Sequence, residues 1–227
     1  MTLNFVLAIC IFCGIIVVLL QSERYLKMSK VKWKGGALIA PLPAVLVACG
    51  SLDKPNVFTV AWTGIINTQP PKTYISVRPS RLSYEYIKES GKFTINLVSS
   101  KYARALDYCG VRSGRDTDKL KDTDLHILPA LELEDTPVIE ESPLSLECVV
   151  TDVIELGTHH MFLADIVATN VEESLINSEG RLRLDKANLI AYSHGEYFEL
   201  GKKLGSFGFS VKKKRKRKKP YNNKRKT

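Results

Sequence analysis

Residues 41–64 read PLPAVLVACGSLDKPNVFTVAWTG and contain two short apolar runs around a polar centre. The runs, residues 44–49 and 57–62, are rich in Val, Ala, Phe and Thr, and the branched and aromatic residues among these favour β-strands. Between them, residues 51–56 supply Ser, Asp, Pro and Asn, the residue types that favour tight turns. This stretch therefore predicts an antiparallel hairpin.

Five further apolar stretches have strand composition and are separated by turn residues. Two helices are expected beside them. Ser80 is placed to cap one that runs to Ser90 and stops at Gly91, and residues 102–108 form the other. We predict a mainly β fold, an antiparallel barrel with a few peripheral helices, because closure satisfies the sheet edges most simply. The further strands are residues 73–77, 93–97, 146–154, 161–171 and 189–192.

The positive charge of the chain is concentrated at its C-terminal end. Lys and Arg number 33 against 24 Asp and Glu, but eleven of the 33 lie in residues 212–227, which hold no acid. The rest of the chain is slightly acidic. A run this cationic repels itself, so we predict a disordered basic tail over residues 212–227. Two roles stay open for it: a solubility tail, or contact with RNA, the ribosome or an anionic membrane, and we expect nucleic acid to bind nowhere else.

The other end carries an apolar run, residues 3–20, in which Asn4 is the only strongly polar residue. At about 1.5 Å per residue, a helix of this length nearly crosses a bilayer. Lys and Arg residues follow the run, which under the positive-inside rule would anchor the domain at the cytoplasmic face of a membrane. The alternative, which we favour, is that translation starts at Met28 and residues 1–27 are not part of the native protein. The working domain is expected to span residues 28–211 in the cytoplasm.

The cysteine pattern indicates a reducing compartment. The number of cysteines, five, is odd, and Cys10 and Cys13 lie inside the apolar run, where neither a thiolate nor a metal ion is stabilised. Cys109 has no identifiable activating base and is interpreted as a packing residue. His159 and His160 are adjacent, so on a strand they point to opposite faces and cannot share a metal ion. We expect no disulfide and no metal site.

Three stretches, in their order and spacing, resemble one known family. The first is residues 41–84, which end in RPSRLSY. The second is residues 107–119, DYCGVRSGRDTDK, and the third runs from Glu147 to the sequence ELGTHHMF at residues 155–162. They resemble the flavin reductase-like, FMN-binding split-barrel family, which includes flavin reductases and flavoredoxins. The resemblance implies an FMN-binding split barrel, FMN as cofactor, NADH or NADPH as co-substrate, and a homodimer with the flavin at or beside the subunit interface.

The resemblance also implies where the flavin binds. A flavin ring needs main-chain donors at its edge, and its phosphate needs cations and hydroxyls. The strand that ends before Gly64 can present free amides to the ring, and the family places the flavin along it. Residues 78–83 combine guanidinium groups and hydroxyls with the positive end of a helix dipole, which suits a phosphate. The candidate ring residues are Thr59, Val60, Ala61, Trp62 and Thr63, and the candidate phosphate residues are Arg78, Ser80, Arg81 and Ser83.

Two more segments complete the candidate site. The loop at residues 109–119 resembles the segment that completes the flavin or nucleotide site in this family, through Ser113, Arg115 and Lys119. His159 matches a family histidine that is thought to lie against the flavin and the nicotinamide, and it is the candidate catalytic residue. The family often has Gly-Asp-His there, whereas this chain has Thr158 before the histidine, so a carboxylate-assisted role is in doubt. The segments of the previous paragraph have simpler alternatives. Residues 59–63 could form an ordinary core strand, and residues 78–83 could start a capped helix with solvated arginines.

We therefore predict an FMN-dependent NAD(P)H oxidoreductase, a flavin reductase that passes hydride from NAD(P)H to flavin N5 and then electrons to an acceptor. A second hypothesis is an electron carrier of the flavoredoxin or ferric reductase type, which keeps FMN tightly bound and serves an acceptor protein or a ferric chelate. A third, of another class, is an RNA- or ribosome-associated protein that acts through the basic tail. No G-x-G-x-x-G fingerprint is present, so the choice between NADH and NADPH stays open.

Overall fold

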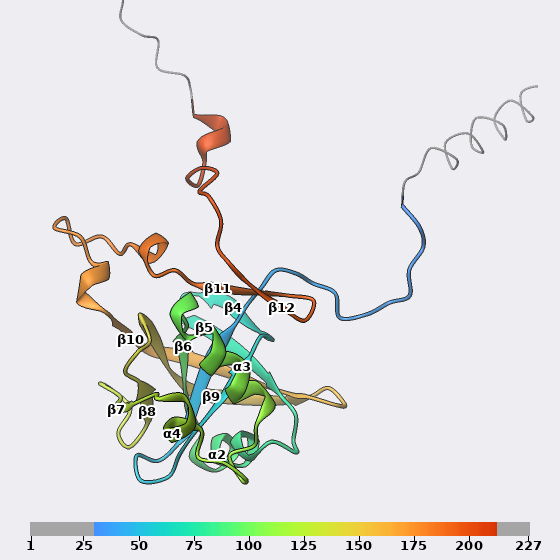
Figure 1. Ribbon diagram of the computed structural model, residues 1–227, viewed down its shortest axis with the longest axis vertical. Coiled ribbons are helices and arrows are strands. Elements are labelled where there is room, and N and C mark those ends of the chain that lie inside the picture. Colours follow the sequence, from blue (N-terminus) through green and yellow to red (C-terminus); the bar gives the residue numbers. More distant parts are fainter. Residues whose placement is uncertain (1–29, 213–227) are drawn as a thin grey trace, which may run out of the picture. The chain divides into compact units, whose positions relative to one another are not determined.

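The structure is a computed structural model that describes residues 30–212 (Figure 1). The chain divides between Leu38 and Ile39 into two units, and the described part of the first unit contains no helix or strand. The apolar run at residues 3–20 and the basic tail from residue 213 onward lie outside the described residues, so both predictions about them stay predictions. Within residues 30–212, no helix is long and apolar enough to cross a membrane.

Seven antiparallel strands form the main sheet of the second unit. Every neighbouring pair is antiparallel, including the predicted hairpin of β2 and β3. The predicted mainly β, antiparallel fold is confirmed. In spatial order the strands are β3 (Pro55–Val60), β2 (Val45–Gly50), β6 (Lys92–Leu97), β9 (Leu144–Glu155), β10 (His160–Val171), β5 (Pro71–Val77) and β4 (Thr63–Thr68).

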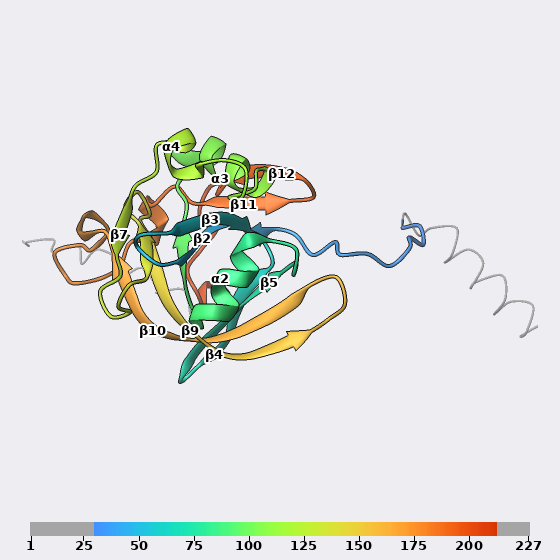
Figure 2. The same ribbon diagram turned by 90° about the horizontal axis from the view of Figure 1, so that it is seen from below.

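The two edge strands of this sheet are consecutive in the sequence. β3 ends at Val60 and β4 begins at Thr63, so only Ala61 and Trp62 join one edge of the sheet to the other. Three Cα steps reach about 11 Å at most, so the sheet must curl until its edges meet. Figures 1 and 2 show the resulting barrel. We call the place where Ala61 and Trp62 link the ends of β3 and β4 the seam.

Smaller elements surround the barrel. Figure 2 shows α3 and α4 on one side of it and β4, β9 and β10 on the other. A three-stranded sheet has the order β1 (Leu42–Pro43), β11 (Ile190–Ser193) and β12 (Glu196–Glu199), and β7 (Ile127–Pro129) pairs with β8 (Pro137–Ile139). The α-helices of the described chain are α2 (Leu82–Ser90), α3 (Ala103–Val111) and α4 (Lys119–Thr123), and 3-10 turns cover Ser100–Tyr102, Glu173–Leu175, Leu184–Lys186 and Phe209–Val211.

The start of α2 corrects one prediction. The helix begins at Leu82, the preceding residue is Arg81, and no side chain caps the helix, so Ser80 is not the cap that we predicted. Its end is as predicted. Gly91 takes the left-handed conformation with φ of 67°, and its N–H donates to the carbonyl oxygen of Ile87.

Several short elements were not predicted: β1, β4, β7, β8, β12 and α4. β4 reads TGIINT, and its last four residues are exposed, so its sequence carries neither a clear alternation nor a buried run. The other predicted helix, residues 102–108, is observed at Ala103–Val111 and runs past Gly110. The unpredicted strands form because they pair with strands elsewhere in the fold, and their own residue pattern does not indicate them.

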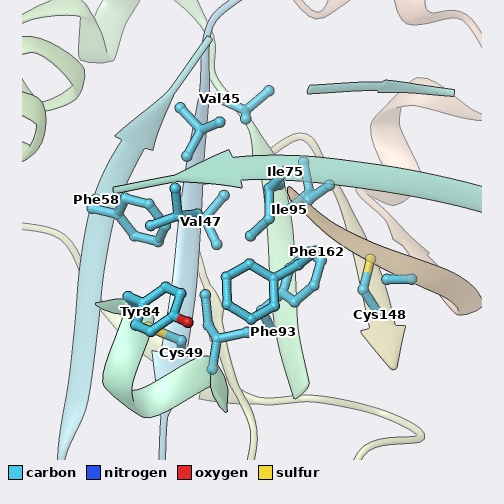
Figure 3. Close-up of a cluster of buried hydrophobic side chains, with 14 residues drawn as sticks. Val45, Val47, Cys49, Phe58, Ile75, Tyr84, Phe93, Ile95, Cys148 and Phe162 are labelled. Carbon is cyan, nitrogen blue, oxygen red and sulfur yellow. The ribbon is translucent and has the colours of Figure 1, made fainter. Parts of the chain in front are cut away.

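Branched and aromatic side chains fill the inside of the barrel (Figure 3). Phe93 and Phe162 are fully buried there, and Ile87 of α2 packs into the same cluster. A second cluster contains residues of β2, β3 and α3, among them Cys109. Burial raises the pKa of Cys109 to about 11, so this thiol stays protonated and serves packing, in agreement with its interpretation from the sequence.

Glu147 of β9 is a fully buried carboxylate that holds a loop. It accepts hydrogen bonds from the backbone N–H groups of Leu131, Glu132 and Leu133, at 2.7, 3.0 and 2.8 Å, and from Asn170 Nδ2 at 2.9 Å. Burial raises the pKa of Glu147, but the four hydrogen bonds together outweigh it and hold the pKa below its ordinary value. The ionised carboxylate therefore fixes the 131–133 segment against the sheet.

We predict that Glu147→Gln lowers the free energy of unfolding at pH 7 by about 2 to 4 kcal/mol, because a neutral amide cannot satisfy all four donors. The folded-state pKa of Glu147 is depressed, so its contribution is present above the unfolded-state pKa and is lost as the pH falls through the folded-state pKa. Urea unfolding of both proteins should thus give a difference that shrinks at acid pH. Exposed Glu196 provides the control Glu196→Gln. A difference that is absent at pH 7, or does not shrink at acid pH, would contradict this role.

Candidate functional site

A cavity of about 300 Å³ opens at the seam. Three hollows elsewhere, of about 670, 470 and 520 Å³, are larger, but none of the three is lined by the seam residues or His159. The cavity at the seam is the candidate site because it gathers residues from four separate segments. They are Phe58, Thr59, Val60, Ala61 and Trp62, then Ser76, Val77, Arg78 and Arg81, then His159, and finally Tyr192.

The seam determines which backbone groups face the cavity. β3 pairs with β2 on one side only, so its other edge carries main-chain groups that no strand of the described chain takes up. Thr59 and Val60 at the end of β3, and Ala61 and Trp62 of the seam, line the cavity. Thr63 does not line it. Thr63 is buried, and its hydroxyl donates to the carbonyl oxygen of Tyr74 at 2.6 Å.

Trp62 and His159 form one wall of the cavity. Their ring centroids are 4.5 Å apart, and the rings are tilted by 47°. Trp62 is 40% exposed, so it does not pack inside the barrel as an ordinary core residue would. Its carbonyl oxygen accepts a hydrogen bond from the N–H of Ser76 at 3.0 Å, which fixes the seam against β5. An aromatic surface is thus held at the cavity mouth.

His159 belongs to the turn between β9 and β10. The turn is closed by a hydrogen bond from the N–H of Leu156 to the carbonyl oxygen of His159 at 3.0 Å, and Gly157 supplies the positive φ of 95° that it requires. Burial, and then the positive charge of Arg78, lower the pKa of His159 below its ordinary value. The imidazole is therefore neutral at pH 7.

Two arginines give the cavity a positive character. Arg78 follows β5, and its guanidinium makes no hydrogen bond or ion pair within residues 30–212. Arg81 precedes α2 and donates one hydrogen bond, to the carbonyl oxygen of Gly110 at 3.1 Å. No Asp or Glu lines the cavity. An anionic group bound there would meet two guanidinium groups that no carboxylate of the described chain pairs with.

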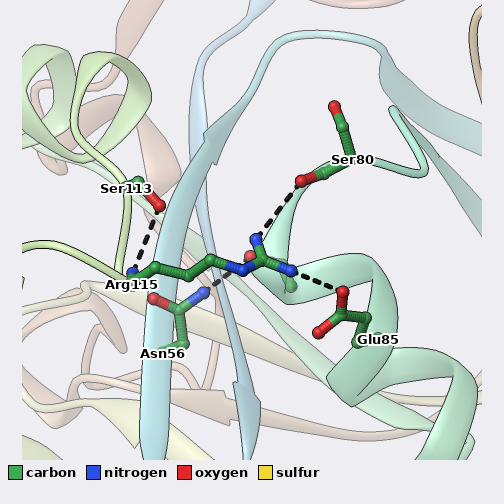
Figure 4. A network of polar contacts seen from close by, with 6 residues as sticks. Asn56, Ser80, Glu85, Ser113 and Arg115 are labelled. Carbon is green, nitrogen blue, oxygen red and sulfur yellow. Dashed lines mark hydrogen bonds and ion pairs between the residues drawn. The ribbon is translucent and has the colours of Figure 1, made fainter.

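Three other candidate residues of the flavin site, Ser80, Ser113 and Arg115, do not line this cavity (Figure 4). Arg115 pairs with Glu85 and donates to the carbonyl oxygen of Ser80 at 3.3 Å, and its own N–H donates to Ser113 Oγ at 3.2 Å. These contacts tie the 113–115 loop to α2. Ser80, Ser113 and Arg115 therefore lie together beside the start of α2 and do not line the seam cavity.

Ser83 and Lys119 are committed to internal hydrogen bonds. Ser83 is buried and accepts a hydrogen bond from Asn56 Nδ2 at 2.7 Å. Lys119 is also buried, and its Nζ donates to the carbonyl oxygens of Val57 and Cys109, at 2.8 and 3.0 Å. Burial lowers the pKa of Lys119. In this structure both side chains hold α2, α3 and β3 together rather than face the cavity.

Phe58, Ser76, Val77 and Tyr192 line the cavity but were not candidate residues, and of these only Tyr192 is remote in sequence from every candidate. It lies on β11, and its backbone pairs with that of Leu42 in β1. Its ring stacks at a tilt against Tyr197 of β12, with centroids 5.7 Å apart. No local motif surrounds it, and the pairing of β1 with β11 joins segments 150 residues apart, so no sequence signal could have placed it here.

His160 is the first residue of β10 and does not line the cavity. Its Nδ1 lies 2.9 Å from the hydroxyl of Tyr84, on the side of the barrel core. Elsewhere in the described chain, one group of potential metal ligands is found. Ligand atoms of His126, Glu140 and Glu141 lie within 4.8 Å of one another. His126 Nδ1 already pairs with Glu141 at 2.6 Å, and this carboxylate raises the pKa of His126. An ion pair accounts for that cluster.

Taken together, the cavity can hold a planar, anionic molecule. Trp62 offers an aromatic face, the edge of β3 offers main-chain groups, and Arg78 and Arg81 offer charge. The lining contains no carboxylate and no cysteine that could act as a base or nucleophile. The arrangement therefore suits binding and orientation of a group that brings its own chemistry.

Comparison with known proteins agrees with this description. The flavoredoxin of Desulfovibrio vulgaris (Miyazaki F) has a TM-score of 0.74 at 31% sequence identity, and the match covers 81% of this chain and all of that one. A flavoredoxin from Methanosarcina acetivorans gives a TM-score of 0.73 at 28% identity, with 82% and 100% covered. An uncharacterised protein of Pyrococcus abyssi is 26% identical over 167 residues, which are 73% of this chain and 95% of that protein.

The family model described as flavin reductase like domain matches residues 39–201. This range contains every strand from β1 to β12 and all the residues that line the cavity. The three stretches on which the resemblance rested lie within it too. The chain therefore belongs to the flavin reductase-like family, and its barrel is the split barrel of that family.

Proposed function

We propose that this protein binds FMN in the seam cavity and acts as a flavin reductase, passing hydride from NADH or NADPH to the flavin. The observation that carries the proposal is the pair of arginines beside an aromatic wall at a strand edge, within a flavin reductase-like domain. Similarity to two flavoredoxins supports a flavin as the ligand. The proposed location is the cytoplasm.

The residues of the cavity fit parts of FMN. Arg78 and Arg81 suit its phosphate, and the main chain from Thr59 to Trp62 suits the polar edge of its ring. A cavity of about 300 Å³ is at the small end for a ligand of this size, so part of the cofactor would remain outside it. When bound, FMN supplies the hydride acceptor and electron store of the reaction.

The chain's own residues bind, orient and exclude water. The arginines hold the phosphate and so fix one end of the cofactor. The seam at Trp62, which is hydrogen-bonded to β5, fixes the ring at the other end. The contact between the Trp62 and His159 rings gives the bound cofactor an aromatic wall. His159, neutral at pH 7, can exchange one hydrogen bond with a bound ligand without adding charge.

A second candidate is a flavoredoxin-type carrier that retains FMN and passes electrons to an acceptor protein or a ferric chelate. The observation that favours it is the 31% identity to a flavoredoxin over 81% of this chain. The two candidates share the cavity and differ in how tightly FMN is held. Retention of FMN through gel filtration, with slow NAD(P)H oxidation until an acceptor is added, would select the carrier.

We also propose a homodimer formed through the outer face of β4, β5, β10 and β9. Phe162, Ala164 and Ile75 of these strands are buried in the core. Alternation then places Tyr74, Met161, Leu163 and Ile154 on the opposite face, where each is partly or fully exposed. This mainly apolar face, which also carries Asp152 opposite Leu163 and the ion pair of Lys72 with Asp165, lies on the side of the barrel away from α3 and α4 (Figure 2).

Arg78→Ala tests the cavity assignment. Loss of a charge-assisted hydrogen bond to phosphate, worth about 1.5 to 3 kcal/mol, should raise the dissociation constant of FMN tenfold or more. Quenching of FMN fluorescence on titration with protein measures this constant. Arg104→Ala, on the exposed side of α3, is the matched control and should bind FMN like the wild type. An unchanged constant for Arg78→Ala would overturn the assignment.

The reaction itself is tested by spectroscopy. FMN bound to the protein should lose its visible absorption under anaerobic conditions when NADH or NADPH is added, because hydride transfer reduces the ring. Free FMN at the same concentration is the control for spontaneous reduction. If the bound flavin stays oxidised with either nucleotide, the protein is not a pyridine-nucleotide-dependent reductase.

Leu163→Glu tests the dimer. A carboxylate in the middle of the apolar face should shift the protein from dimer to monomer in sedimentation velocity. Leu128→Glu places the same charge on an exposed leucine of β7, outside this face, and should leave the sedimentation coefficient unchanged. A wild type that sediments as a monomer at all concentrations would contradict the proposal.

A further inference from the structure

The side chain beside His159 makes a specific contact with its imidazole. Thr158 Oγ1 lies 3.0 Å from His159 Nδ1. His159 Nε2 has no hydrogen-bond partner within residues 30–212, so it is the nitrogen left for a ligand. The Trp62 ring packs against the same imidazole at 4.5 Å between centroids. The ring is thus held on two sides, by a hydroxyl at one nitrogen and by an indole at its face.

The charged groups around the imidazole come from several elements. Arg78 and Arg81 line the same cavity from the segment between β5 and α2, and both are cationic. Glu155, on the hairpin of His159, faces His160 instead, at 3.9 Å. Tyr192 is the titratable group contributed by β11. The surroundings therefore oppose a positive charge on His159, in line with its lowered pKa, and no carboxylate of the cavity lining offsets this.

A hydroxyl next to a neutral imidazole can either donate to Nδ1 or accept from it, unlike a carboxylate, which can only accept. Thr158 has no other hydrogen-bond acceptor within the described residues. Its proton is therefore free for Nδ1. Donation to Nδ1 puts the imidazole proton on Nε2.

We propose that Thr158 is a positioning residue that holds His159 as the neutral tautomer protonated at Nε2, so that His159 offers one hydrogen-bond donor to a ligand in the seam cavity. The inference rests on the proposed function for its purpose, because a flavin carbonyl or a nicotinamide amide is the acceptor that such a donor would meet. The tautomer of His159 itself is a property of the protein without any ligand.

The direct test is long-range ¹H–¹⁵N NMR of the ligand-free protein. The chain has four histidines, and His159 is assigned by the signals that disappear in His159→Gln. At pH 7.5 the expected pattern is a neutral ring with its proton on Nε2. A ring protonated at Nδ1, or a charged ring at this pH, would overturn the proposal whether or not FMN binds.

Three substitutions of Thr158 separate positioning from simple packing. Thr158→Ser keeps the hydroxyl and should keep the tautomer and pKa of His159. Thr158→Val keeps the shape but loses the donor, so the tautomer protonated at Nδ1 should gain population, while burial and Arg78 still hold the pKa below its ordinary value. Thr158→Asp should raise the pKa of His159 by about one unit or more, because a nearby carboxylate stabilises the charged ring.

The pH dependence of FMN binding gives a second readout. The titration of His159 should appear at higher pH in Thr158→Asp than in the wild type, while Thr158→Ser should match the wild type. Identical NMR titrations for the Val, Asp and wild-type proteins would overturn the proposal. If FMN fails to bind any of them while the NMR titrations differ as expected, the positioning role stands and the proposed function fails.

Discussion

The structure depends on one connection, the two residues that join the edge strands of the main sheet. Because Ala61 and Trp62 must reach from β3 to β4, the sheet cannot stay open, and its edges meet at the seam. The same connection turns Trp62 outward and leaves one edge of β3 without a partner strand. Closure of the barrel and formation of the cavity are therefore two results of one short link.

The chemistry of the cavity follows from what reaches the seam. The segment after β5 delivers Arg78 and Arg81, and the β9–β10 hairpin delivers His159. No acidic side chain arrives with them, so the charge is positive, and burial together with Arg78 keeps the imidazole neutral. Such a site binds and orients but holds no nucleophile of its own, which fits a family whose reactions are carried by a flavin.

Much of this could be predicted from the sequence. The strong strand patterns, the hairpin at residues 51–56 and the family were readable because each depends on local residues or on motif order. The internal hydrogen bonds of Ser83 and Lys119 could not be predicted, because their partners, Asn56 and the carbonyl oxygens of Val57 and Cys109, come from other elements. Tyr192 was missed for the same reason, since only the pairing of β1 with β11 brings it to the cavity.

The most direct test of the central claim is a crystal structure of the protein with bound FMN. The seam account predicts the flavin ring along the edge of β3 beside Trp62 and the phosphate within ion-pair distance of Arg78 or Arg81. A phosphate bound instead at the loop that holds Arg115, or a ring placed away from residues 59–62, would contradict it.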